Sequence, residues 1–234
     1  MHILRYSAVF IASLSIFSLS GCTDNFKSAL DSIQIARELN KGTEITTEYI
    51  AATPYASSLV TINDAKPILL ILGLAEQNPT NAAYQLTWIA EDKGTIVTEN
   101  GRIIHTTGFD TSNLETLLIK GQQLSLPGQS SSWQAIYDWS PGYRYNFSAD
   151  ITSMSLGMET IVTDLWTQQA EHIQEQVAFN SLNSKIINDF WVAPETNSNK
   201  PFVVKSIQYL GPNMDKVEML MVKPFIEQKL NTTN

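Results

Sequence analysis

The stretch from Leu86 to Gly108, LTWIAEDKGTIVTENGRIIHTTG, is the part of the chain that most restricts its fold. In LTWIA, Leu86, Trp88 and Ala90 alternate with Thr87 and Ile89, and both TIVTE and RIIHT are rich in β-branched residues. The turn EDKG separates the first two runs. The pair Asn100-Gly101, the strongest two-residue hairpin signal, separates the last two, and Gly101 supplies the positive φ of a type I′ turn. The pattern therefore predicts three antiparallel strands in a meander.

Further strand candidates lie on both sides of this meander. They are SLVTI, KPILLILGLAE, the aromatic runs around the turn SPG, the hairpin DFWVAPETNSNKPFVVKSIQYL and KVEMLMVKPF. Residues 158–179 fit either a loose helix or strands. The segment after Phe26 and the stretch RELNKGTEITTEY predict two short helices, the second with Thr43 as N-cap. We expect a mainly β (or α+β) protein, with an antiparallel meander sheet forming a sandwich or an incomplete barrel and short N-terminal helices.

The N-terminal residues have the layout of an export signal. Arg5 precedes an apolar run from Ala8 to Leu19, and the sequence LSGC follows with Cys22, the only cysteine. Leu-Ser-Gly-Cys fits the bacterial lipobox, in which the thiol receives a diacylglycerol and the peptide is cut before it. The alternative is a buried core cysteine. By the sorting rule for diderm bacteria, Thr23 after the cysteine predicts the periplasmic face of the outer membrane.

These features predict four segments. Residues 1–21 form a cleaved lipoprotein signal peptide, residues 22–42 a lipidated tether with an N-terminal helix, residues 43–226 a single β-rich domain and residues 227–234 a polar tail. The formal net charge of -8 gives no basic footprint for nucleic acid. The expected contact with a membrane is therefore through the lipid.

The sequence offers little support for catalysis or for a metal. It has no His-x-x-x-His pair, no cysteine cluster, no Gly-x-Ser-x-Gly elbow and no phosphate-binding glycine loop. We expect no metal and no cofactor. Four carboxylates are candidates for glycoside chemistry if the fold pairs them, and a solvated face is the alternative for all of them: Glu159, Asp164, Glu171 and Glu175.

Aromatic residues crowd between positions 133 and 145. Trp133, Tyr137, Trp139 and Tyr143 are candidates for binding a glycan or a protein partner, because aromatic rings stack on apolar sugar faces and are common at interfaces. Alternating aromatics in a strand are also typical of a core, and that alternative stays open.

Several segments, in order along the chain, resemble one family. They are the lipobox ending at Cys22, PYASSLV at 54–60, LTWIAEDKGTIVTENGRIIHTTGF at 86–109, NDFWV at 188–192, KSIQYLGP at 205–212 and the pair Lys223-Pro224. Together they resemble the YjbF/GfcB outer-membrane lipoproteins, which are found with exopolysaccharide and group 4 capsule export genes. The resemblance implies a β-rich domain, so it favours strands for residues 158–179. It brings no catalytic motif.

The resemblance also implies a function. We expect a lipid-anchored periplasmic accessory protein for export or assembly of a surface polysaccharide, which binds a partner or the glycan and is not an enzyme. The implied partner is an outer-membrane β-barrel protein encoded in the same operon. Among the matching residues, Arg102 is the functional candidate, with a surface ion pair as its alternative. The rival functions are a lipid or glycolipid carrier with a β-sheet cavity and a glycan-modifying enzyme.

Overall fold

The fold was taken from a computed structural model, which describes residues 45–226 except 82, 91–93, 121–122, 143 and 197–199. Cys22, Thr43 and Tyr143 lie outside the described residues. So do the predicted signal peptide, the predicted tether and the predicted tail.

The described residues form one short helix, one 3-10 turn and twelve strands. In chain order these are α2 (Thr47–Ala52), β1 (Ser57–Ile62), β2 (Ile68–Gln77), β3 (Tyr84–Ile89), β4 (Thr95–Glu99), β5 (Arg102–Thr107), β6 (Asn113–Ile119), β7 (Ser132–Ser140), β8 (Arg144–Val162), β9 (Thr167–Phe179), η1 (Asn180–Leu182), β10 (Ser184–Ala193), β11 (Phe202–Tyr209) and β12 (Lys216–Lys223). The mainly β prediction is confirmed, and residues 158–179 are strands.

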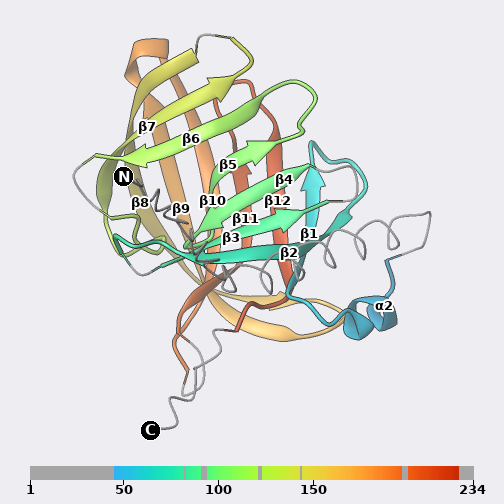
Figure 1. The fold of residues 1–234 in the computed structure, drawn as a ribbon. Coiled ribbons are helices and arrows are strands. Elements are labelled where there is room, and N and C mark those ends of the chain that lie inside the picture. The colour runs from blue at the N-terminus through green and yellow to red at the C-terminus, as the bar shows by residue number, and fades with distance from the viewer. Residues whose placement is uncertain are drawn as a thin grey trace, which may run out of the picture.

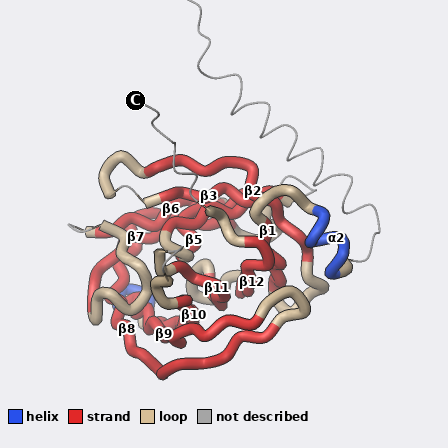
Figure 2. The backbone as a smooth tube through the Cα atoms, turned by 90° about the horizontal axis from the view of Figure 1, so that it is seen from below, coloured by secondary structure: helices blue, strands red, loops and turns tan. Residues whose placement is uncertain are grey.

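All the strands belong to one antiparallel sheet that curls into a nearly closed barrel (Figures 1 and 2). The strand order is β5-β4-β3-β2-β1-β12-β11-β10-β9-β8-β7-β6, so the first strand pairs with the last. The sheet ends, β5 and β6, meet through side chains. The Leu114 amide donates to Thr106 Oγ1 at 2.9 Å, and His105 Nδ1 lies 2.7 Å from the Glu115 carbonyl oxygen. Of the two predicted architectures, the structure is the barrel.

Alternation along the strands fills the barrel interior. In β7, Ala135, Tyr137 and Trp139 are buried, whereas the residues between them are less so, because successive side chains of a strand point to opposite faces. These side chains belong to a core that also includes Trp88 and Phe179. The two-residue turn Asn100-Gly101 is confirmed, since both residues have positive φ, 50° and 78°, and Glu99 pairs with Arg102.

The long hairpin of β8 and β9 extends past the barrel wall. Its strands pair as far as Val162 and Thr167, but β9 pairs with β10 only up to Glu171. We call residues 157–170, the end of this hairpin, the strap. Figure 1 shows it curving below the barrel towards α2. Ile161 and Trp166 of the strap pack on the outer cluster around Trp191.

The helix α2 lies on the outside of the barrel beside the strap. Its Ile50 packs with Leu69 and Val222, and Leu165 of the strap joins the same cluster. Thr46 is the N-cap, with Oγ1 accepting from the Tyr49 amide at 3.3 Å. The helix therefore begins three residues later than a Thr43 cap predicts, because Thr46 is the hydroxyl residue placed to accept from the third amide of this turn. Within the described residues, no helix has the length and apolar character needed to cross a bilayer.

Candidate functional site

Arg102 lies inside the barrel in an ion pair with Glu175. The arginine starts β5 immediately after the Asn100-Gly101 turn, and the glutamate points inward from β9. Arg102 Nε donates to Glu175 Oε2 at 3.1 Å and Nη2 donates to Oε1 at 2.5 Å. The side chains are 4% and 2% exposed. The expectation of a surface ion pair is therefore wrong, because the curl of the sheet turns the start of β5 inward and brings β9 opposite it.

Other groups complete the surroundings of this pair. Ser153 Oγ donates to Glu175 Oε1 at 2.9 Å, and Arg102 Nη1 donates to the Ser125 carbonyl oxygen. The guanidinium carbon lies 5.1 Å from the ring centroid of Trp133 and 5.5 Å from that of Phe190. Removing one partner of such a pair typically costs about 3–5 kcal/mol, since the other charge stays buried alone. Glu175 and Ser125 already accept hydrogen bonds from the guanidinium, so Arg102 connects β5 to β9 and to the β6–β7 loop inside the barrel.

Two of the other predicted aromatic residues also form part of the interior. Tyr137 and Trp139 are 3% and 2% exposed, and the Tyr137 ring meets Phe179 edge to face at 5.1 Å. Trp139 Nε1 donates to the Leu210 carbonyl oxygen at 2.7 Å. Burial, together with the nearby Glu175 carboxylate, raises the pKa of Tyr137, while Arg102 opposes that shift. Neither ring presents a face to solvent, so the core alternative accounts for both residues.

The four candidate carboxylates do not share one environment. Glu175 is the buried one of the four and is held by Arg102. Glu159 lies on the strap and accepts from Trp191 Nε1 at 2.7 Å. Glu171 accepts from Ser155 Oγ at 2.5 Å, and Asp164 is exposed in the β8–β9 turn. Among the described residues, no group of three or more His, Cys, Asp and Glu side chains could hold a metal ion.

The β6–β7 loop covers one end of the barrel. In its described part, residues 123–131, the Leu124 carbonyl oxygen accepts from Asn100 Nδ2 at 2.6 Å, and Gln123 Nε2 donates to the Thr80 carbonyl oxygen at 2.7 Å. Gly128 lies so near Ile173 that an added Cβ would be 2.8 Å from its side chain. The loop thus joins the β2–β3 and β4–β5 turns to the inside of β9.

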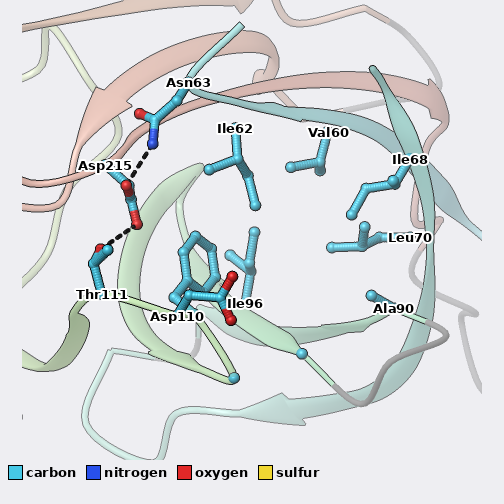
Figure 3. Close-up of a pocket in the computed structure, with 13 residues that line it drawn as sticks. Val60, Ile62, Asn63, Ile68, Leu70, Ala90, Ile96, Asp110, Thr111 and Asp215 are labelled. Atoms are coloured by element: carbon cyan, nitrogen blue, oxygen red, sulfur yellow. Dashed lines mark hydrogen bonds between the residues drawn. The ribbon is translucent and has the colours of Figure 1, made fainter. Parts of the chain in front are cut away.

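The opposite end of the barrel contains a cavity of about 250 Å³ (Figure 3). It lies among the β1–β2, β3–β4, β5–β6 and β11–β12 turns. Its walls are inward-facing side chains of the barrel core, which include Val60, Ile62, Ile68, Leu70, Ile96 and Phe109. The cavity is therefore a part of the barrel interior that the core side chains leave unfilled.

Polar groups gather at the mouth of this cavity. Asp215 accepts from Asn63 Nδ2 at 2.5 Å and from Thr111 Oγ1 at 3.2 Å, so its carboxylate ties three turns together (Figure 3). Asp110 is exposed at the same mouth. Lys216 lies next to Asp215 in sequence, but its amino group is 2.6 Å from Asp64, whose hydrogen bond raises the lysine pKa.

Sequence reasoning raised a β-sheet cavity only as part of the rival carrier function, and it did not identify the lining residues or the acidic mouth. The apolar lining residues were assigned to strands, and their alternation identified an inward face. Whether side chains on opposite walls meet or leave a space depends on the curvature of the barrel, which the alternation does not encode. The GFDT turn, residues 108–111, contained the one available signal, a carboxylate and a hydroxyl beside an aromatic residue.

Comparison with known proteins gives a consistent set of relatives. The family profile "Group 4 capsule polysaccharide lipoprotein gfcB, YjbF" matches residues 21–222. The uncharacterized lipoprotein GfcB of Escherichia coli K12 is 27% identical over 226 residues, which cover 90% of this chain and 97% of GfcB. The uncharacterized lipoprotein YjbF of the same organism is 22% identical over 212 residues, which cover 88% and 92%. The crystal structure of the hypothetical lipoprotein YmcC from Escherichia coli K12 matches with a TM-score of 0.63 at 27% identity, covering 86% of this chain and 95% of YmcC.

Proposed function

Because the chain belongs to the family of group 4 capsule polysaccharide lipoproteins that includes GfcB and YjbF, we propose that it is a lipid-anchored accessory protein for export or assembly of a surface polysaccharide. In this proposal it acts by binding and not by catalysis. The observation that carries the proposal is the family match over residues 21–222, which begins next to Cys22 of the lipobox and runs through the barrel to β12.

The lipid has a physical role in this function. Cys22 anchors the protein at the periplasmic face of the outer membrane, and the tether places the barrel next to an exporter in the same membrane. Confining two proteins to one surface raises their effective concentration, so a weak contact suffices for docking. The partner is an outer-membrane β-barrel protein of the same operon, and the docked complex passes the polysaccharide outward.

The experiment that tests this function separates the anchor from the barrel. We expect Cys22→Ser to leave a folded periplasmic protein, because the thiol lies in the predicted tether, while surface polysaccharide falls sharply at ordinary expression. Overexpression of Cys22→Ser should partly restore the polysaccharide by raising the bulk concentration. Thr23→Ser, which keeps the thiol, is the matched control. Polysaccharide is measured on intact cells, and folding by circular dichroism of the purified protein.

Normal polysaccharide export by Cys22→Ser at ordinary expression would contradict docking in the membrane plane. A folded variant that stays inactive at every expression level would assign the lipid a role other than raising local concentration. The cavity at the open end of the barrel supports a second candidate function, the binding of an amphiphile.

A further inference from the structure

We propose that the cavity at the end of the barrel opposite the β6–β7 loop, here called the open end, binds the single alkyl chain of an amphiphile whose head group is an uncharged sugar. The chain enters between Val60, Leu70 and Ile96, and the head group stays at the mouth beside Asp110 and Asp215. This ligand deepens the proposed function and rests on it for the choice of a sugar among hydroxylated head groups.

The walls and the size of the cavity select the chain. The lining is formed mainly by aliphatic side chains, with Ala90 and the ring of Phe109, so a methylene chain replaces contact with water by contact with apolar groups. A water molecule takes about 30 Å³ of the liquid and a methylene group is of similar size. A volume of about 250 Å³ therefore holds a chain of about eight carbons. Two chains, or a bulky ring system, exceed it.

The position of the cavity selects the direction of entry. The end of the barrel opposite the cavity is covered by residues 123–131 and crossed by the Arg102–Glu175 pair. An alkyl chain therefore cannot enter the barrel from that end. At the open end, Asn63, Asp110 and Thr111 are exposed, and the mouth faces solvent between the turns. The mouths of β-barrels are frequent ligand sites. A bound chain thus lies in the barrel with its head group in water.

The charge of the mouth disfavours an anionic head group. Asp110 and Asp215 both line it, and neither arginine nor lysine is among the described lining residues. The Lys216 amino group is held by Asp64. An anionic head group would meet two carboxylates, and like charges in contact are strongly unfavourable. Sugar hydroxyls donate to carboxylate oxygens instead, and Asp110 has no hydrogen-bond partner among the described residues.

Binding of three probes with the same octyl chain, and of one sugar without it, tests the proposal directly. Octyl β-glucoside, octyl sulfate, octylammonium and free glucose are titrated into the purified full-length chain carrying Cys22→Ser, below their micelle concentrations, by calorimetry. We expect saturable binding of one octyl glucoside per protein molecule. Octyl sulfate should bind at least about tenfold more weakly, because of the two carboxylates, and glucose should not bind, because it has no chain.

Two variants locate the site. Ala90→Leu adds three carbons to the wall of the cavity and should abolish octyl glucoside binding. Asp110→Asn keeps the shape of an exposed side chain but removes one of the two negative charges at the mouth. It should therefore narrow the difference in affinity between octyl glucoside and octyl sulfate. Asp164→Asn, an exposed aspartate at the tip of the strap, is the charge-matched control and should bind both probes as the unaltered barrel does. Circular dichroism and the melting temperature establish that each variant is folded.

Absence of saturable octyl glucoside binding to the folded protein would overturn the proposal. So would equal affinity for octyl sulfate, tighter binding of octylammonium than of octyl glucoside, or unchanged binding by a folded Ala90→Leu. The outcome is separate from that of the proposed function. The polysaccharide assay with Cys22→Ser depends on the anchor, whereas these titrations use a protein without one.

Discussion

At the scale of the residue, Gly101 occupies a position that only glycine fits. Its φ of 78° lies in the left-handed region, and an added Cβ would be 2.3 Å from Cγ2 of Val203. The close approach matters because the turn delivers Arg102 into the barrel one residue later. Gln208 holds the same turn from β11: its Nε2 donates to the Gly101 carbonyl oxygen at 3.0 Å, and its Oε1 accepts from the Ile103 amide at 3.0 Å.

We predict that Gly101→Val destabilises the protein by more than the roughly 1–3 kcal/mol of backbone strain alone, because the side chain also collides with Val203. The matched control is Gly142→Val, where φ is 95° but an added Cβ meets nothing within 4 Å. Denaturant unfolding measures both. Equal losses of unfolding free energy in the two variants would assign the whole effect to the positive φ. An unchanged denaturation midpoint of Gly101→Val would contradict the assignment of Asn100-Gly101 as a tight turn.

At the scale of the element, the strap is held to the barrel by a polar cluster on the outer face. Glu159 accepts from Trp191 Nε1 at 2.7 Å and lies 2.8 Å from His172 Nδ1. His172 Nε2 is 2.9 Å from Asp189, its ring stacks on Trp191 at 4.4 Å, and the Lys205 amino group lies 4.9 Å from the same indole. These side-chain contacts connect β8 to β10 and β11, although β8 has no backbone pairing with either strand.

This cluster predicts that the strap loosens in acid. The hydrogen bonds from Trp191 and then His172 lower the pKa of Glu159 below its ordinary value of 4.5. A depressed pKa means that the carboxylate stabilises the folded state above the ordinary value, and that this contribution disappears as pH falls through the folded-state pKa. Protection of amides in residues 157–170 against hydrogen exchange should therefore drop below about pH 4.5.

Glu159→Gln tests the source of this pH dependence. The amide oxygen still accepts from Trp191, but it does not titrate, so protection of the strap should change less between neutral and acid pH than in the unaltered protein. Asp164→Asn, also on the strap and exposed, is the control and should keep the full pH dependence. The same pH response in Glu159→Gln as in the unaltered protein would assign the effect to other groups.

At the scale of the whole molecule, the barrel is closed without a complete ladder. β5 and β6 end the sheet, and the bonds that join them use the side chains of Thr106 and His105. Inside, the Arg102–Glu175 pair links β5 to β9, and Gln208 links it to β11. The contacts made by Thr106, Arg102, Glu175 and Gln208 are costly to break because these side chains are buried.

Thr106→Val should weaken the closure. Valine has nearly the same shape as threonine but accepts no hydrogen bond, so the buried Leu114 amide loses its partner at a cost of about 1–3 kcal/mol. Exchange of amides in β5 and β6 should rise. Thr107→Val is the neighbouring control. It loses only an exposed contact with Thr95 and should stay within about 0.5 kcal/mol. Equal stability of the two variants would show that the Thr106 bond does not hold the ends together.

The sequence by itself determined the local features of this protein. The meander, the Asn100-Gly101 turn and the strands on either side follow from alternation and turn residues, because backbone geometry repeats over two residues in a strand. The family resemblance rested on ordered short segments, which a linear sequence displays directly. Residues 158–179 were harder, since the strap, residues 157–170, extends past the barrel wall and its buried and exposed positions do not alternate simply.

Only the tertiary structure decided how these elements meet. Arg102 and Glu175 are 73 residues apart in sequence, and nothing near either residue predicts that the other lies opposite it. The alternation around Tyr137 and Trp139 favoured a core but left a binding face open, and the direction in which the sheet curls turned both residues inward. The cavity depends on the same curvature, because its volume is the space that the inward side chains of the curled sheet leave unfilled.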